Sequence, residues 1–145
     1  MQIIIRTLVN NDYKTVFAGF DRSLFLALKP PLMPLELLRF DGCETGDEVH
    51  IQLGAGPLTT RWDAEIIDHG ASDSEIYFVD SGKRLPPFLS RWRHRHRILN
   101  RGQQAEIVDD IEYHTPFRLL DYLMYPVMYL QFWMRKPVYK KVFNR

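Results

Sequence analysis

Several features that would place the chain in a special class are scarce. Cys43 is the only cysteine among 145 residues, which excludes an internal disulfide and favours a reducing compartment. The formal net charge is only +1, so total charge gives no argument for a nucleic-acid or membrane partner. The most apolar run, Leu119 to Met134, is shorter than the ~20 residues of a spanning helix and contains Asp121 and Gln131.

Internal repeats, biased linkers and low-complexity segments are also lacking. The composition, 46% hydrophobic and 26% charged, is that of an ordinary globular protein. Residues 1–145 are therefore expected to form one domain. The chain opens into a strand-like run instead of a secretion signal, so we expect a cytoplasmic protein.

What the sequence does contain is a succession of short strand patterns. Gln2 to Leu8 is rich in β-branched residues and predicts a first strand. Two short helices are expected next, with Asp12 and Asp21 as their caps. From Leu32 onward, turn signals separate short segments, which is typical of an antiparallel meander. The expected strands are Leu35 to Phe40, Val49 to Leu53, Thr59 to Ile67, Glu75 to Asp80, Arg91 to Leu99 and Ala105 to His114.

A C-terminal helix is predicted to follow the strands. Thr115 is the expected N-cap, and Pro116 suits the first helical position, where its missing N–H costs nothing. The helix should run towards Phe143, and Pro126 and Pro137 should kink or interrupt it. This order of elements predicts an α+β fold in which a curved antiparallel sheet packs against a long C-terminal helix.

The pattern of one β-hairpin carries most of the functional argument. Residues 91–98 alternate strictly, so a strand places four arginines on one face. The other face carries Trp92, His94, His96 and Ile98. With a turn near Arg101 and Gly102, Trp92 faces Ile111 and His94 faces Asp109 on the next strand.

The four arginines have two interpretations. The same register sets Arg91, Arg93 and Arg97 opposite acidic residues, namely Glu112, Asp110 and Glu106. This pairing favours a solvated, ion-paired face, because neighbouring carboxylates cancel the local field. The alternative is a phosphate-binding stripe. We expect no nucleic-acid partner.

The inner face of the hairpin combines polar and apolar side chains. Buried polar groups need partners, because an unpaired one costs about 1–3 kcal/mol. His94 and Asp109 either satisfy each other as a structural pair or line a pocket and orient the polar end of a ligand. A third alternative is a metal site, for which two histidines and a carboxylate on neighbouring strands could supply three ligands, but no third strand contributes a clear donor. Acid–base catalysis by His94 or His96 with Asp109 is a fourth, but the sequence supplies no nucleophile.

Alternation predicts further inward positions on the neighbouring strands. Trp62 shares a face with Ile66, and Phe78 shares one with Ile76 and Asp80. Plain core packing is the better interpretation for the two isoleucines. Trp62 and Asp80 are awkward in a tightly packed core, which makes them candidates for a pocket wall.

These residues, in this order, resemble the START/Bet v 1-like (SRPBCC) superfamily of polyketide cyclase/dehydrase and lipid-transport proteins, in particular its small bacterial stand-alone members. The resemblance extends over essentially the whole chain. Its motifs are Phe78-Val79-Asp80, Pro87-Phe88, Trp92-x-His94-x-His96-x-Ile98 and Asp109-x-x-x-Tyr113-x-x-Pro116-Phe117.

The resemblance implies a helix-grip fold, in which the curved sheet wraps the C-terminal helix and leaves a cavity for a hydrophobic molecule. The chain departs from the family pattern at Arg118, where a glycine is common. It also departs at Pro126 and Pro137, because the long helix of the family usually lacks internal prolines.

The C-terminal segment is rich in aromatic residues and methionine, which suits either core packing or an irregular pocket. Its end, Arg135 to Arg145, is basic, so brief contact with an anionic membrane is an alternative role. The residues expected to bind the ligand are Trp62, Phe78, Asp80, Trp92, His94, His96, Asp109, Tyr113, Tyr122, Tyr125 and Tyr129.

Three functions follow as hypotheses. The first is binding or transport of a small hydrophobic ligand, such as a lipid or polyketide, in the internal cavity. The second is a cyclase, dehydratase or isomerase with His94, His96 and Asp109 as its candidate catalytic residues. The third is an adaptor that uses the C-terminal helix to contact a protein or membrane. We expect no cofactor and no bound metal.

Overall fold

The computed structural model describes residues 1–31 and 33–144. Two positions of the expected pattern, Leu32 at the start of the meander and Arg145 at the basic end, lie outside this range. The strands are β1 (Gln2–Val9), β2 (Leu35–Phe40), β3 (Glu48–Leu53), β4 (Thr60–Ala71), β5 (Glu75–Arg84), β6 (Arg91–Arg101) and β7 (Gln104–His114). The helices are α1 (Tyr13–Ala18), α2 (Arg22–Ala27), α3 (Arg118–Trp133) and α4 (Arg135–Phe143), with a short 3-10 turn at Gly56–Leu58.

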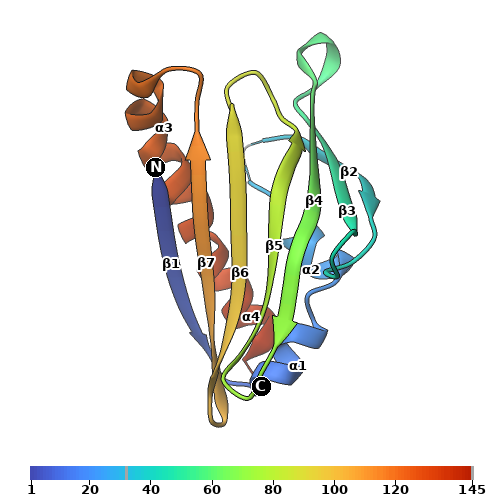
Figure 1. Cartoon of the computed structure of the whole chain (residues 1–145), viewed down its shortest axis with the longest axis vertical. Coiled ribbons are helices and arrows are strands. Elements are labelled where there is room, and N and C mark those ends of the chain that lie inside the picture. The colour runs from blue at the N-terminus through green and yellow to red at the C-terminus, as the bar shows by residue number, and fades with distance from the viewer. Residues whose placement is uncertain (32, 145) are drawn as a thin grey trace.

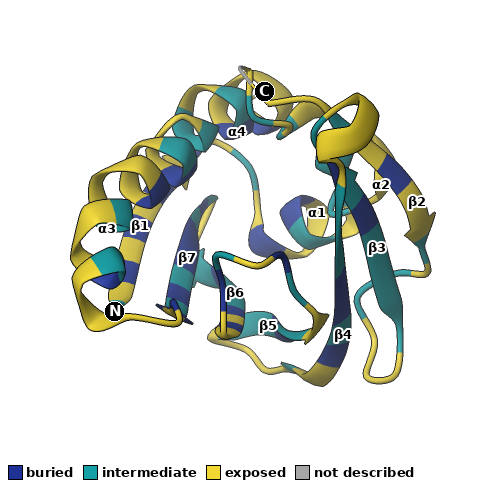
Figure 2. Ribbon diagram, turned by 90° about the horizontal axis from the view of Figure 1, so that it is seen from above, coloured by how far each residue is buried: buried dark blue, intermediate teal, exposed yellow. Residues whose placement is uncertain are grey.

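The strands form one antiparallel sheet in the order β1-β7-β6-β5-β4-β3-β2. Each strand neighbours the next in sequence, except that β1 pairs with β7 (Figure 1). Register shifts interrupt the β4–β5 ladder at Asp63/Ala64 and at Ile66/Asp68. Such irregularities bend a strand, and here they accompany the strong curvature of the sheet seen from above (Figure 2).

The concave side of the sheet holds the core. In β1, alternate residues Ile3, Ile5, Thr7 and Val9 are buried, as a strand with one covered face requires. The helices α3 and α4 lie across this side (Figure 2). The helix-grip fold predicted from the sequence is therefore confirmed.

The two short helices begin where the sequence places their caps. Asp12 accepts hydrogen bonds from the backbone N–H groups of Lys14 and Thr15, and Asp21 accepts one from Leu24. These bonds satisfy N–H groups that have no partner inside the first turn. The proline pair after α2 prevents its continuation, as expected.

The predicted start of the C-terminal helix is wrong. α3 begins at Arg118, with Phe117 as its N-cap residue. The Thr115 hydroxyl donates to the carbonyl of Phe117 instead of accepting from a helical N–H, and the Thr115 N–H donates to Asp121 Oδ1 at 2.6 Å. Thr115 therefore closes a turn ahead of the helix and does not cap it.

The two prolines have different effects. Pro126 lies inside the continuous helix α3. Pro137 lies in the first turn of α4, just after the break at Met134 that separates the two helices. A proline at this position cannot donate to the carbonyl of Trp133 and clashes with it, which accounts for the break. No helix in the described ranges has both the length and the hydropathy to cross a bilayer.

The hairpin β6–β7 has the predicted faces but not the predicted register. Trp92 pairs with Tyr113 instead of Ile111, and His96, not His94, stands opposite Asp109. Arg101 pairs with Gln104, so the loop is Gly102–Gln103. Gly102 has a φ of 75°, a conformation that glycine adopts without strain at the first position of a two-residue hairpin loop. The turn therefore lies one residue later, which shifts the pairing by two residues and keeps each side chain on its face.

The partners of the arginines differ accordingly. Arg97 Nε donates to Glu75 on β5 at 2.7 Å, and Arg95 lies 3.8 Å from the same carboxylate. The expected ion pairs of Arg91, Arg93 and Arg97 with β7 are not formed between the described residues. The side chains do point away from the core, as predicted.

Some strand ends were also misplaced. β4 continues past its expected end at Ile67 to Ala71, through the turn signals of residues 68–70, and β5 continues past Asp80 to Arg84. Pairing between these two long strands overrides the local turn signals.

Candidate ligand-binding cavity

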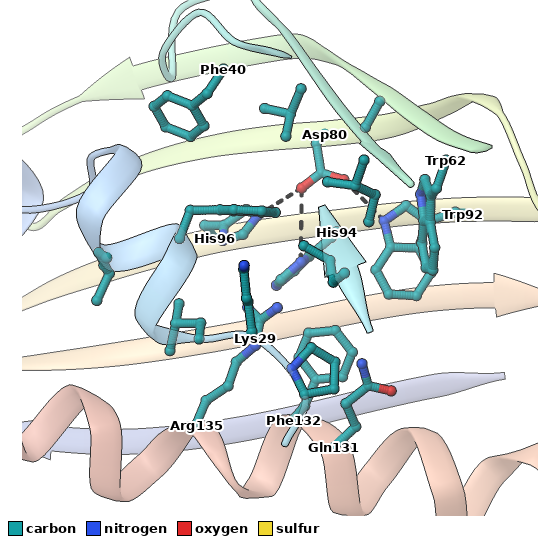
Figure 3. A pocket seen from close by; sticks show the side chains of 18 of the residues that line it. Lys29, Phe40, Trp62, Asp80, Trp92, His94, His96, Gln131, Phe132 and Arg135 are labelled. Carbon is teal, nitrogen blue, oxygen red and sulfur yellow. Dashed lines mark hydrogen bonds and ion pairs between the residues drawn. The ribbon is translucent and has the colours of Figure 1, made fainter. Parts of the chain in front are cut away.

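A cavity of about 320 Å³ lies between the concave side of the sheet and the helices. Its wall is formed by α2, the strands β2 to β6, and the inward faces of α3 and α4. Most of the lining side chains are apolar or aromatic. The volume and lining are those of a small-molecule site. Figure 3 shows the cavity with some of its wall residues labelled, among them Asp80, His94 and His96.

Six of the predicted site residues lie on this wall: Trp62, Phe78, Asp80, Trp92, His94 and His96. Strand alternation places them there, since each projects from the concave face of β4, β5 or β6. The rings of Trp62 and Trp92 meet edge to face at 4.8 Å, and the ring of Phe78 stacks on His96 at 4.2 Å. The alternation in the sequence thus located the polar and aromatic wall residues of β4 to β6, but not the wall residues of β2 and β3.

Asp80, His94 and His96 form a polar cluster on this largely apolar wall (Figure 3). The register sets Asp80 of β5 opposite His94 of β6. Because a carboxylate can only accept, His96 Nε2–H donates to Asp80 Oδ2 at 2.7 Å and Trp92 Nε1–H donates to Asp80 Oδ1 at 2.9 Å. His94 Nδ1 lies 3.8 Å from Asp80 Oδ2, and the two imidazole rings stack at 3.6 Å.

A second carboxylate supports the cluster from behind. Asp109, which is 1% exposed, accepts from His94 Nε2–H at 2.9 Å and from the Tyr139 hydroxyl at 3.4 Å. Arg135 lies 3.8 Å from the same oxygen and covers the ring of Phe132 at 4.3 Å. The predicted contact between His94 and Asp109 is therefore present, although the bond crosses the ladder diagonally. Its burial fits the structural-pair interpretation of that contact.

The electrostatics leave the carboxylates charged and His96 neutral. Burial lowers the pKa of His96 to about 4, and the neighbouring His94 adds to this effect. Burial alone would raise the pKa of Asp80, but hydrogen bonding from His96 and the nearby imidazoles outweigh it, so the pKa is lowered. The pKa of Asp109 is also lowered, because His94 and Arg135 outweigh its burial. At neutral pH the wall thus presents an ionised Asp80 bonded to a neutral imidazole.

The donor atoms of Asp80, His94 and His96 lie within 4.8 Å of one another, so a metal site is a geometric alternative. The sequence interpretation found no clear donor on a third strand beside β6 and β7, whereas Asp80 of β5 supplies one. Ligand atoms of one tetrahedral zinc lie about 3.3 Å apart. His96 Nε2 and Asp80 Oδ2 are only 2.7 Å apart and share a hydrogen bond. A metal would have to break this bond and separate the two atoms, so the arrangement is that of a hydrogen-bonded cluster.

Five predicted site residues do not line the cavity: Asp109, Tyr113, Tyr122, Tyr125 and Tyr129. Tyr113 is fully buried, and its hydroxyl donates to the carbonyl of Asp121. Tyr122 and Tyr129 are 54% and 42% exposed on the outside of α3. Tyr125 packs partly buried beside Tyr129.

The sequence interpretation missed the helical part of the wall. On α3, Met124, Met128 and Phe132 face the sheet. They are four residues apart, so if one of them had been known to face inward, the helical period would have predicted the other two. Lys29, which follows α2, and Arg135, the first residue of α4, also reach the cavity (Figure 3). Their sequence positions carried no signal for this placement.

Known structures share this architecture. A protein from Chromobacterium violaceum superposes with a TM-score of 0.72 at 13% identity, covering 100% of this chain and 99% of that one. An aromatase/cyclase from a Streptomyces species gives 0.58 at 14% identity, covering 81% and 69%. Norcoclaurine synthase from Thalictrum flavum, in complex with a transition-state analogue, gives 0.62 at 12% identity, covering 87% and 82%.

No protein-family model and no curated protein sequence matches the chain. At these identities the structural matches establish the fold. The chain has the helix-grip fold of Bet v 1-like proteins, as the resemblance of its motifs predicted.

Proposed function

We propose that this protein binds a small, mainly hydrophobic molecule in the cavity, with the polar end of the molecule at Asp80, His94 and His96. The observation that carries the proposal is an apolar cavity of about 320 Å³ with one polar cluster on its sheet side. Apolar walls supply affinity through burial, and a few fixed polar groups orient the ligand. Proteins that share the fold include an aromatase/cyclase, which fits such a cavity but assigns no reaction to this chain.

The cavity can be tested by filling it. Ala64 is on the cavity wall and is 8% exposed, whereas the next residue, Glu65, is not on the wall. We expect Ala64→Trp to weaken binding of the fluorescent probe N-phenylnaphthylamine at least ten-fold, because the indole occupies ligand space. Glu65→Trp should bind the probe like the parent protein. Equal binding by Ala64→Trp, with its fold verified by circular dichroism, would contradict the proposal.

A second candidate is acid–base catalysis in the same cavity, which the Asp80–His96 hydrogen bond favours. At neutral pH the His96 imidazole is in the unprotonated form that a general base requires, and Asp80 holds its orientation, while a pKa of about 4 makes it a weak base. For any substrate found, His96→Gln should keep binding within a few-fold while lowering kcat by about 100-fold or more. If kcat survives this substitution, the role of His96 is confined to binding.

A further inference from the structure

The helix α3 is apolar on both of its faces. Met124, Met128 and Phe132 face the cavity. The outer face, defined here as Leu119, Tyr122, Leu123, Pro126, Leu130 and Trp133, is exposed along the whole helix (Figure 2). Five of these side chains are between 49% and 71% exposed. A helix that is hydrophobic all round is normally covered on all sides, and a contiguous apolar patch of this kind marks an interaction site.

The exposed charges of α3 and α4 are of one sign. Residues 118–143 contain five basic residues and one acidic residue, although the whole chain has a net charge of only +1. The acidic residue, Asp121, is buried and accepts a hydrogen bond from the Thr115 N–H. Of the described residues in α3 and α4, those on the exposed side therefore include basic but no acidic groups. Arg118 stands at one end, and the exposed Lys140 and Lys141 stand at the other.

We propose that the outer face of α3, together with Lys140 and Lys141, docks on an anionic lipid bilayer. Apolar and aromatic side chains of an interfacial helix enter the boundary between headgroups and acyl chains, while lysines contact anionic headgroups. Tyrosine and tryptophan are favoured at that depth because their rings are apolar with a polar edge.

A second copy of the chain fits this face less well. If two copies paired about a two-fold axis with their α3 helices antiparallel, the start of α3 in one copy would meet the end of α3 and α4 in the other copy. Arg118 would then approach Lys140 and Lys141 of the second copy, and like charges at an interface oppose association. An anionic surface has the complementary sign.

Docking would bring the cavity to within one helix of the bilayer, because α3 forms part of its wall. A role in exchanging a hydrophobic ligand with the bilayer rests on the proposed function, whereas docking itself does not. The experiment must therefore measure vesicle binding and cavity binding separately.

Co-sedimentation with phosphatidylcholine vesicles, with and without phosphatidylglycerol, tests the docking surface. The parent protein should bind the anionic vesicles and lose this binding in high salt. The double variant Leu123→Glu with Leu130→Glu should bind at least ten-fold more weakly, since it replaces two exposed leucines that docking would bury in the bilayer. Leu58→Glu is the matched control, because Leu58 is 84% exposed in the turn between β3 and β4. It should bind like the parent.

The basic residues are tested in the same assay. Lys140→Gln with Lys141→Gln should lower binding to anionic vesicles about 25-fold, because each lysine near the surface contributes roughly five-fold. Lys14→Gln, on α1, is the control and should have no effect.

Three outcomes would overturn the docking proposal. One is the absence of vesicle binding, and another is equal binding with and without phosphatidylglycerol. The third is a concentration-dependent dimer, seen by sedimentation velocity, that Leu123→Glu with Leu130→Glu abolishes while vesicle binding is not detected. N-phenylnaphthylamine binding without vesicles should be unchanged in this variant, because neither leucine lines the cavity. Loss of docking is thereby distinguished from loss of the cavity function.

Discussion

His96 shows at the scale of one residue how burial sets the chemistry of the wall. Its imidazole is enclosed by Phe78, His94 and Asp80. Its Nδ1 is buried without a hydrogen-bond partner among residues 1–31 and 33–144. The folded chain therefore keeps this histidine neutral at pH values where a free imidazole is half protonated.

This depressed pKa predicts a loss of stability in mild acid. Between the ordinary histidine pKa of 6.5 and the folded value of about 4, the unfolded chain binds a proton that the folded chain does not. The free energy of unfolding should therefore fall as the pH falls through this window, by roughly 3 kcal/mol in all. Asp80 and Asp109, whose pKa values are lowered from 3.8, add their own loss of stability mainly below about pH 5, at the acid end of the window.

Urea denaturation at several pH values measures this effect. His96→Gln removes the titrating group and should flatten the profile between pH 6.5 and about pH 5, above the range in which the carboxyl groups titrate. His114→Gln, at an exposed position, should keep the slope of the parent protein. If the free energy of unfolding of His96→Gln still falls as steeply with pH, the loss of stability comes from other titrating groups.

Asp109 and Asp110 are adjacent carboxylates with opposite environments. Asp109 accepts from the buried His94 and Tyr139, whereas Asp110 accepts from the exposed Gln2. We expect Asp109→Asn to lower the free energy of unfolding by roughly 3–5 kcal/mol, because it removes one partner of a buried charged network. Asp110→Asn should cost less than about 1 kcal/mol. Similar values for both variants would show that the buried network contributes little.

At the scale of the elements, the turn between β6 and β7 determines which residues of the cavity meet. Gly102 occupies the position with φ of 75° that fixes the register. Gly102→Ala should lower the free energy of unfolding by about 1 kcal/mol, because a Cβ disfavours the left-handed conformation. Gln103→Ala, in the same loop but without a positive φ, should change it by less than about 0.5 kcal/mol. A cost for Gly102→Ala as small as that of Gln103→Ala would contradict this account of the turn.

The predictable part of the structure follows from alternation. Inward and outward faces of β1, β4, β5 and β6 depend only on a period of two, so Trp62, Asp80 and His96 were placed on the correct side. Register depends in addition on which residues form the turn. The predicted turn at Arg101 and Gly102 lies one residue before the observed loop Gly102–Gln103, so every predicted pair was shifted by two residues. The face of the sheet on which a side chain lies was thus easier to predict than its pairing partner on the next strand.

The helical part was harder to predict because α3 is apolar all round. The period of a helix identifies an inward stripe only when the opposite stripe is polar. Here Tyr122 and Tyr129 were assigned to the cavity, although Met124 and Met128 face it. The start of the helix was misplaced because Thr115 bonds Phe117 and Asp121 in a turn of its own.

At the scale of the whole molecule, the curved sheet and the helices enclose one apolar space with a polar cluster from two strands on its wall. The three tryptophans sample different parts of this architecture. Trp62 and Trp92 lie on the cavity wall, and Trp133 is 49% exposed on the outer face of α3. Their indole N–H groups therefore report separately on the inside and the outside.

The most direct test of the binding function is a titration with N-phenylnaphthylamine followed by the indole N–H resonances in a proton–nitrogen correlation spectrum. If the ligand enters the cavity, the signals of Trp62 and Trp92 shift in parallel with binding, and the signal of Trp133 stays in place. If only the Trp133 signal shifts, the probe binds the outer surface, and the claim that the cavity binds a hydrophobic molecule is contradicted.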